Sequence, residues 1–170
     1  MTTFQREWLT PELADALEPL LQQHKHEIAH YPDIPLGVDW STYAALQTAG
    51  KLVLFTVRRD AQLLGYACFV VAHHLHYNTS LQAQQDVLWL APALRGRFQG
   101  PKFLKWCDTQ LLALGVQVVY HHVKAAHDFA PILLRLGYTH IDTIYGRRLD
   151  TAHAVDTFVQ GELALTGASI

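Results

Sequence analysis

Two apolar runs separated by a short polar segment are the feature that most constrains the fold of this 170-residue chain. Residues 52–58 read LVLFTVR, residues 63–76 form a second and longer apolar run, and the polar segment RDAQ separates them. Apolar and β-branched runs this close together predict an antiparallel β-hairpin. Half of all residues are apolar and 16% are charged, so one domain of this length can bury the faces of such a sheet.

Helical patterns flank the hairpin. Thr10 suits an N-cap and Pro11 a first helical position, and leucines then recur at helical spacing up to residue 28. The remaining elements expected are a helix over 40–48, a strand over 87–90, a helix over 103–114, a strand over 116–124, a helix over 128–136 and one or two strands over 138–149. This order predicts an α+β fold, with a mixed and mostly antiparallel central sheet flanked by helices. We expect one domain over 1–150, followed by a tail or a docked short helix over 151–170.

A basic segment free of acidic residues lies between Asp86 and Asp108, where a strand, a loop and a helix follow one another. Cations are unfavourable at a helix N-terminus, which already carries a partial positive charge, so their accumulation there indicates a bound anion. Glycines in the loop would let the backbone approach that anion closely. The residues concerned are Arg95, Gly96, Arg97, Gly100, Lys102 and Lys105.

The loop RGRFQG resembles the pyrophosphate loop of the GNAT family of N-acetyltransferases, which reads Gln/Arg-x-x-Gly-x-Gly/Ala. Arg95 matches the first position and Gly100 the last, whereas Phe98 stands where glycine is usual. The element order over about 10–149 is similar to that of the family, and the FAPILLRLGY segment resembles its closing helix. Three runs resemble GNAT-like proteins encoded by tailed bacteriophages: HLHY at 74–77, HVK at 122–124 and LGY at 136–138.

The resemblance implies a GNAT-like fold and an N-acetyltransferase that uses acetyl-CoA as its cosubstrate. Acetyl-CoA would lie in the opening between the strands at 87–90 and 116–124. Backbone groups near the end of the first strand would polarise the thioester carbonyl, and the loop would hold the pyrophosphate. The cofactor-binding residues implied are Trp89, Leu90, Arg95, Gly96, Arg97, Phe98, Gln99 and Gly100.

The resemblance also implies direct attack of an amine on the thioester, assisted by a base and an acid. The family's usual tyrosine acid corresponds to Leu133 here, which cannot transfer a proton. Candidates for the acid are Tyr120, His121, His122, Tyr138 and Tyr145, and candidates for the base are Asp86, His76 and His74. We expect Tyr120, His122, His76 and Asp86 to be the catalytic residues.

Charge and composition bear on the partners. The formal charge of −2 argues against a nucleic-acid-coating protein. Seven of the 15 acidic residues lie in the first 39 positions, and the resemblance implies that the first two helices line the acceptor side, so it implies an amine-bearing acceptor, either a small molecule or a protein. The N-terminus lacks a signal-peptide pattern and no apolar run approaches a membrane span, so we expect a cytoplasmic protein, in the host cytoplasm if phage-encoded, without a membrane partner. A homodimer through 151–170 is an alternative to docking of that segment.

Eleven histidines and two cysteines raise the question of a metal. His74 and His76 share one face of the expected strand, but the sequence has no Cys pair and no His-x-x-x-His on a helix, so it predicts no metal site. Two further hypotheses stay open: a GNAT-fold binding or virion-associated module with little activity, and a phage enzyme that modifies a nucleobase amine.

Overall fold

The computed structural model describes residues 1–96 and 98–150. It forms two compact units, Met1–Tyr138 and a second unit that begins at Thr139. Arg97 and the segment 151–170 lie outside the described residues.

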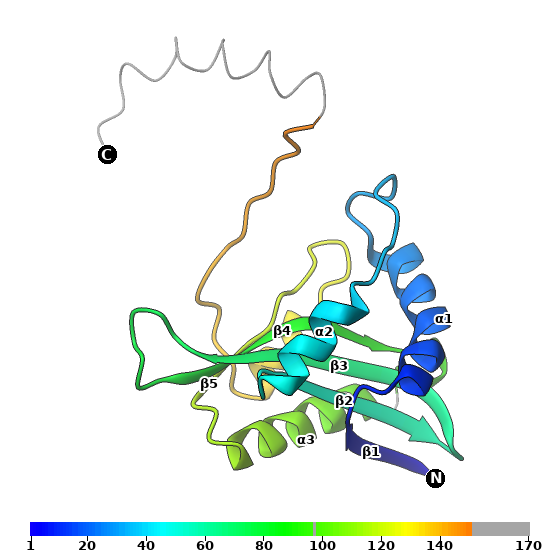
Figure 1. Cartoon of the computed structure of the whole chain (residues 1–170), viewed down its shortest axis with the longest axis horizontal. Coiled ribbons are helices and arrows are strands. Elements are labelled where there is room, and N and C mark those ends of the chain that lie inside the picture. Colours follow the sequence, from blue (N-terminus) through cyan, green and yellow to red (C-terminus); the bar gives the residue numbers. More distant parts are fainter. Residues whose placement is uncertain (97, 151–170) are drawn as a thin grey trace. The chain divides into compact units, whose positions relative to one another are not determined.

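Five strands form one sheet in the order β1-β2-β3-β4-β5 (Figure 1). Neighbouring strands run antiparallel except β4 and β5, which are parallel. The predicted hairpin is confirmed as β2 and β3, joined through Asp60 and Ala61, whose positive φ angles of 50° and 68° match the primed turns that suit a twisted hairpin. The strands are β1 (Thr2–Glu7), β2 (Leu52–Arg59), β3 (Gln62–His73), β4 (Leu81–Leu90) and β5 (Val118–Tyr120).

Helices cover both faces of the sheet. On one face, α1 (Pro11–Ile28) and α2 (Trp40–Thr48) pack on a core that includes Leu54, Tyr66 and Trp89. On the other, α3 (Gln99–Ala113) packs on a core that includes Phe55 and Phe69. A 3₁₀ turn, η1 (Pro92–Leu94), precedes α3, and α4 (Ala130–Arg135) follows β5. The predicted mixed, mostly antiparallel sheet flanked by helices is therefore confirmed.

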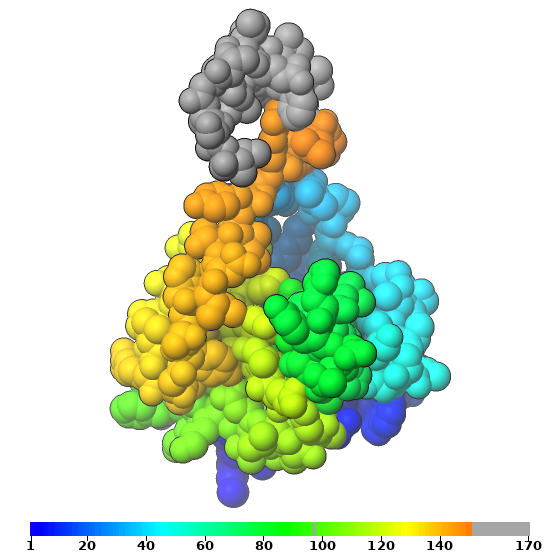
Figure 2. Space-filling model, turned by 90° about the vertical axis from the view of Figure 1, so that its left-hand side faces the viewer, coloured from blue at the N-terminus to red at the C-terminus, as the bar shows by residue number. Residues whose placement is uncertain are grey.

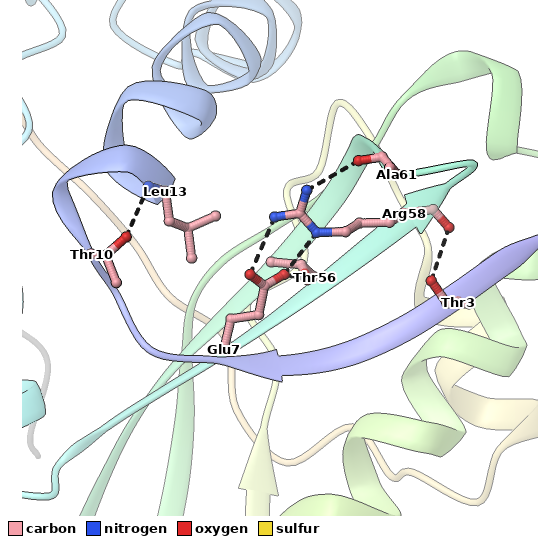
Figure 3. Close-up of polar contacts among 7 residues, drawn as sticks. All are labelled: Thr3, Glu7, Thr10, Leu13, Thr56, Arg58 and Ala61. Atoms are coloured by element: carbon pink, nitrogen blue, oxygen red, sulfur yellow. Dashed lines mark hydrogen bonds and ion pairs between the residues drawn. The ribbon is translucent and has the colours of Figure 1, made fainter.

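The edge strand β1 has no counterpart among the elements expected from the sequence. Its residues are mostly polar because it lies at the edge of the sheet, where Phe4 alone supplies a large apolar side chain, 5.2 Å from the ring of Phe103 between centroids. The end of β1 is fixed by Glu7 (Figure 3). Its carboxylate accepts hydrogen bonds from Nε of Arg58 at 2.9 Å, from Nη2 at 3.2 Å and from the hydroxyl of Thr56.

Several element boundaries also differ from those expected. β4 begins at Leu81 and not at 87, because its glutamines sit between two partner strands that satisfy the backbone. β5 keeps only three residues of the strand expected over 116–124, and β3 ends at His73, so the expected extension of this strand to 76 is wrong. The strands expected over 138–149 are wrong as well: the described residues 139–150 contain no strand. An alternating pattern indicates strand propensity, but a strand also needs a partner for its backbone groups.

Gly65 of β3 lies opposite Leu90, at the end of β4. A methyl group there would lie 2.9 Å from the carbonyl oxygen of Trp89 and 2.5 Å from a methyl of Leu90. We expect Gly65→Ala to lower the free energy of unfolding by about 2 kcal/mol, because the backbone of β4 must shift. Urea denaturation measures this. Gly37→Ala is the control, since a methyl group at Gly37 has nothing within 4 Å, and equal effects of the two variants would contradict the prediction.

Candidate active site

A β-bulge at Asp86 divides β4 into two parts. In the pairing with β3, Gln85 lies opposite Phe69 and Val87 lies opposite Cys68, so Asp86 is the extra residue. The bulge changes which side chains face each layer: Ala83 packs in the α3 core before it, and Val87 packs in the α1/α2 core after it. Asp86 itself faces the α1/α2 side, where its Oδ2 accepts a hydrogen bond from the hydroxyl of Tyr43 on α2.

Beyond the bulge, one edge of β4 is open. β5 pairs with β4 only from Gln82 to Gln84, and the described residues place no strand beside the rest of that edge. The amide of Ala91 donates to the carbonyl of Leu64, and because backbone groups alternate along a strand, those of Leu88 and Leu90 point to the open edge. The carbonyl of Leu90 accepts a hydrogen bond from Arg95, so this edge offers an extended ligand the amides of Leu88 and Leu90 and the carbonyl of Leu88. Trp89, by contrast, pairs with Tyr66 of β3.

The N-terminus of α3 lies against this end of β4. A methyl group on Gly100 would be 3.8 Å from Cδ1 of Leu90. No side chain caps the helix, its first turn holds no acidic residue, and Pro101 has no N–H, so the amides of Gln99 and Gly100 are the free donors of that turn. Together with the helix dipole, these amides could donate hydrogen bonds to an anion, and the anion site that the sequence predicts stays a prediction.

Arg95 has a different surrounding from the one implied by the loop resemblance. Its guanidinium forms two hydrogen bonds with the carboxylate of Glu27 on α1, at 2.5 and 2.7 Å, and its Nε donates to the carbonyl of Leu90 at 2.8 Å. The indole of Trp89 donates to the same carboxylate at 3.0 Å. The hydrogen bonds from Arg95 are the main cause that lowers the pKa of Glu27 to about 2. Arg95 thus ties the end of α1 to the end of β4.

The expected catalytic residues fall into two groups. Asp86, Tyr120 and His122 lie together around the point where β4 and β5 separate: Tyr120 is opposite Gln84 in the register, and Nε2 of His122 is 3.0 Å from the amide nitrogen of Gln84. His76 lies apart, in the β3–β4 loop that forms part of the surface at one end of the sheet (Figure 2). This loop ends directly before Leu81, and Leu81 is five strand residues, or about 16 Å, from Asp86.

A buried network of hydrogen bonds behind the bulge contains two of the acid candidates, His121 and Tyr138, and links them to Gln85 and Asp108, which the sequence did not point to. Nδ1 of His121 is 2.6 Å from the side-chain oxygen of Gln85, and Nε2 is 3.2 Å from the hydroxyl of Tyr138, which donates to Asp108 on α3 at 2.5 Å. Burial lowers the pKa of His121 to about 4 and raises the pKa values of Asp108 and Tyr138. These hydrogen bonds fix the position of Gln85, the residue that precedes Asp86. One signal in the sequence pointed to a buried histidine here: His121 and His122 are consecutive in an expected strand, so their side chains point to opposite faces.

Solved structures share this architecture. A "predicted acetyltransferase" of Clostridium acetobutylicum with acetyl-CoA superposes with a TM-score of 0.65 at 11% identity, over 88% of this chain and 97% of that one. Glucosamine-6-phosphate N-acetyltransferase of Arabidopsis thaliana gives 0.66 at 12% identity, over 87% and 99%. A transcriptional regulator of Bacillus halodurans gives 0.63 at 16% identity, over 87% and 99%. No protein-family model matches the sequence, and no curated protein matches it either.

The chain has the GNAT fold. The open edge of β4 and the uncapped start of α3 are the two places where the resemblance to the GNAT family predicts acetyl-CoA. Leu133, at the position of the family's usual tyrosine, is buried on α4. Within the described residues, no helix has the length and apolar character needed to cross a membrane. In the same part of the chain, no three His, Cys, Asp or Glu side chains come together in a way that could hold a metal ion.

Phe98 adopts the left-handed conformation that suits glycine at this position of the GNAT loop. Its φ is 58° and its side chain is 76% exposed, so the strain is not offset by packing. We expect Phe98→Gly to raise the free energy of unfolding by about 0.5–1 kcal/mol, as measured by urea denaturation. Gln99→Gly is the control and should lower it, because Gln99 is helical. A loss of stability in Phe98→Gly would contradict the prediction.

Proposed function

We propose that this protein is an N-acetyltransferase that transfers the acetyl group of acetyl-CoA to an amine by direct attack. The observation that carries the proposal is the meeting of two binding elements: the open edge of β4 beyond the bulge and the uncapped, acid-free N-terminus of α3. The first suits the amide-rich pantetheine arm, and the second suits the pyrophosphate. The GNAT fold of the chain supports the proposal.

In the proposed reaction, the residues around the bulge act on the amine and the thioester. The amides of Leu88 and Leu90 at the open edge would donate hydrogen bonds to the thioester oxygen as negative charge develops on it. Asp86 would accept a proton from the attacking amine, and Tyr43 orients this carboxylate through its hydroxyl. Tyr120 and His122 stay the candidates for protonating the leaving thiolate. Arg95 acts as a positioning residue, because its guanidinium is bound to Glu27.

The proposal is tested by calorimetry with acetyl-CoA on the full-length protein and on Gln99→Glu. A carboxylate at the first turn of α3 favours the helix but repels a bound anion, so we expect Gln99→Glu to keep or raise stability and to weaken acetyl-CoA binding about tenfold. Gln117→Glu adds the same charge at an exposed position and should bind as the wild type does. Absence of binding to folded wild-type protein at sub-millimolar acetyl-CoA would overturn the proposal.

A second candidate function is a GNAT-fold binding module with little or no turnover, for example one associated with a phage virion. The buried Leu133 in place of a tyrosine favours it. This candidate predicts acetyl-CoA binding without acetylation of any amine. Base modification in nucleic acid is a narrower variant, which mass spectrometry of DNA after expression would detect. The phage relationship, a cytoplasmic location and a homodimer stay predictions.

A further inference from the structure

An apolar pocket opens on the α1/α2 face beside the bulge. Its volume is about 210 Å³, and its walls come from both helices, the 36–39 segment, the 9–10 turn and strands β2, β3 and β4. Two of its lining residues adjoin Asp86: Val87 follows Asp86 in β4, and Tyr43 bonds to its carboxylate. The apolar walls are formed by Leu9, Leu17, Leu21, Leu36, Val38, Trp40, Leu52, Leu54 and Val87.

Asp39, Tyr43 and Tyr66, three polar side chains in the walls, are already paired inside the protein. Asp39 caps α2 through hydrogen bonds from Ser41 and Thr42, at 2.5 to 3.0 Å. The hydroxyl of Tyr66 is 2.7 Å from Nδ1 of the buried His24. The pocket therefore offers an apolar interior with few unmet hydrogen-bonding groups. Such a space favours a hydrocarbon group and disfavours a sugar or a polyamine.

In contrast to the apolar interior, a carboxylate, that of Asp86, lies next to the lining residues Tyr43 and Val87. Asp86 is exposed, Tyr43 occupies its Oδ2, and no described residue bonds to its Oδ1. A cationic amine can therefore bind the free oxygen of Asp86 while the group that carries the amine enters the pocket. Asp39, the carboxylate in the lining, is engaged in capping α2. The apolar interior and the neighbouring carboxylate of Asp86 together match one kind of molecule.

We propose that the acceptor is a small primary amine carried on an aromatic or aliphatic group, with that group in the pocket and the nitrogen at Asp86. This inference rests on the proposed function and names its substrate class. A volume of 210 Å³ corresponds to about seven water molecules at liquid density, which fits a whole small amine of about ten non-hydrogen atoms.

The placement also brings the amine to the reacting carbonyl. Val87 lines the pocket and directly follows Asp86, and Leu88, the next residue, directs its amide to the open edge of β4. The bound ammonium first releases one proton to solvent. The neutral amine nitrogen then forms a bond to the acetyl carbon, and a second of its protons passes to Asp86. The carbon–sulfur bond breaks, and the thiolate takes a proton from solvent or from a neighbouring acid.

The test measures release of free CoA thiol by the full-length protein with three acceptor probes: 2-phenylethylamine, glucosamine, and a peptide with an N-terminal phenylalanine. Burial of the phenyl group should give 2-phenylethylamine a kcat/KM at least tenfold above the other two. An equal or higher value for glucosamine or for the peptide overturns the inference. So does the absence of turnover with all three when calorimetry shows acetyl-CoA binding. Absence of acetyl-CoA binding overturns the proposed function itself.

A pair of variants links the preference to the pocket. Val38→Trp adds bulk to the wall, so it should raise the KM for 2-phenylethylamine about tenfold and leave the KM for acetyl-CoA unchanged. Ile34→Trp makes a comparable change in the same α1–α2 segment at a residue outside the lining, and it should leave both constants unchanged. Equal KM values for 2-phenylethylamine in the two variants would overturn the assignment of the pocket.

Discussion

Lowering the pH from 6.5 to 4 is expected to destabilise the protein through two buried histidines. Burial is the main cause that lowers the pKa of both His24 and His121 to about 4. In the unfolded chain an imidazole takes up its proton near pH 6.5, so over this interval the unfolded state binds more protons than the folded state. Each histidine therefore contributes stability that is complete above pH 6.5 and lost as the pH falls toward 4, on the order of 2–3 kcal/mol.

Other titrating groups act outside this window or against it. The pKa values of Glu7 and Glu27 are lowered by their arginine partners, so their contribution is lost only below about pH 4.5. Burial raises the pKa of Asp108, which gives a smaller stabilisation on acidification and partly offsets His121. The net expectation is a free energy of unfolding that falls steadily between pH 6.5 and 4.5.

Urea denaturation at several pH values measures this dependence. His24→Gln and His121→Gln should each flatten the profile between pH 6.5 and 4.5, because a glutamine has no proton to take up. His26→Gln, at an exposed position on the same helix as His24, is the matched control and should keep the wild-type slope. A wild-type profile without slope over this interval would contradict the assignment of neutral, buried imidazoles.

Replacing Asp86 by asparagine is expected to lower kcat/KM for the amine about 100-fold, since the variant keeps the shape of the side chain but accepts no proton. The fold should be unaffected because Asp86 is exposed and the asparagine oxygen can still accept from Tyr43. Steady-state thiol release gives the rate, and thermal unfolding checks the stability.

Two further variants interpret the result. Tyr43→Phe removes the hydroxyl that orients the carboxylate and should cost less than Asp86→Asn. Asp15→Asn removes an exposed carboxylate from α1 and should leave kcat/KM unchanged. If Asp86→Asn retained kcat/KM within twofold, Asp86 would have no role in proton transfer.

The parts of the fold that local pattern determines could be predicted from the sequence. Thr10 caps α1 as expected, its hydroxyl accepting from the amide of Leu13 at 3.2 Å (Figure 3). The hairpin and the position of α3 likewise follow from short-range periodicity and from glycine. The GNAT resemblance of the RGRFQG loop agrees with the observed fold because the strand before the loop and the helix after it are local features.

The parts that depend on distant partners could not be predicted. β1 is a strand because its backbone pairs with the distant strand β2, a pairing that the contact of Glu7 with Arg58 supports, and nothing in its polar sequence signals that pairing. The sequence predicts Arg95 as a cofactor-binding residue, but Glu27, at the far end of α1, binds its guanidinium. The bulge at Asp86 arises from the register with β3, so the sequence could give Asp86 as a candidate base but not the direction of its side chain.

The short pairing between β4 and β5 has a consequence for local unfolding. Among the described residues, three register pairs join β5 to the sheet. Beside them, the amide of Gln117 donates to the carbonyl of Leu81, and the side chains of Gln84 and Gln85 contact His122 and His121. The amides of β5 should therefore exchange with solvent through a local opening, faster than those of the hairpin between β2 and β3. This opening would take place where β4 and β5 separate. A ligand bound along β4 would hinder it, so slower hydrogen exchange of the β5 amides would show that the ligand has bound.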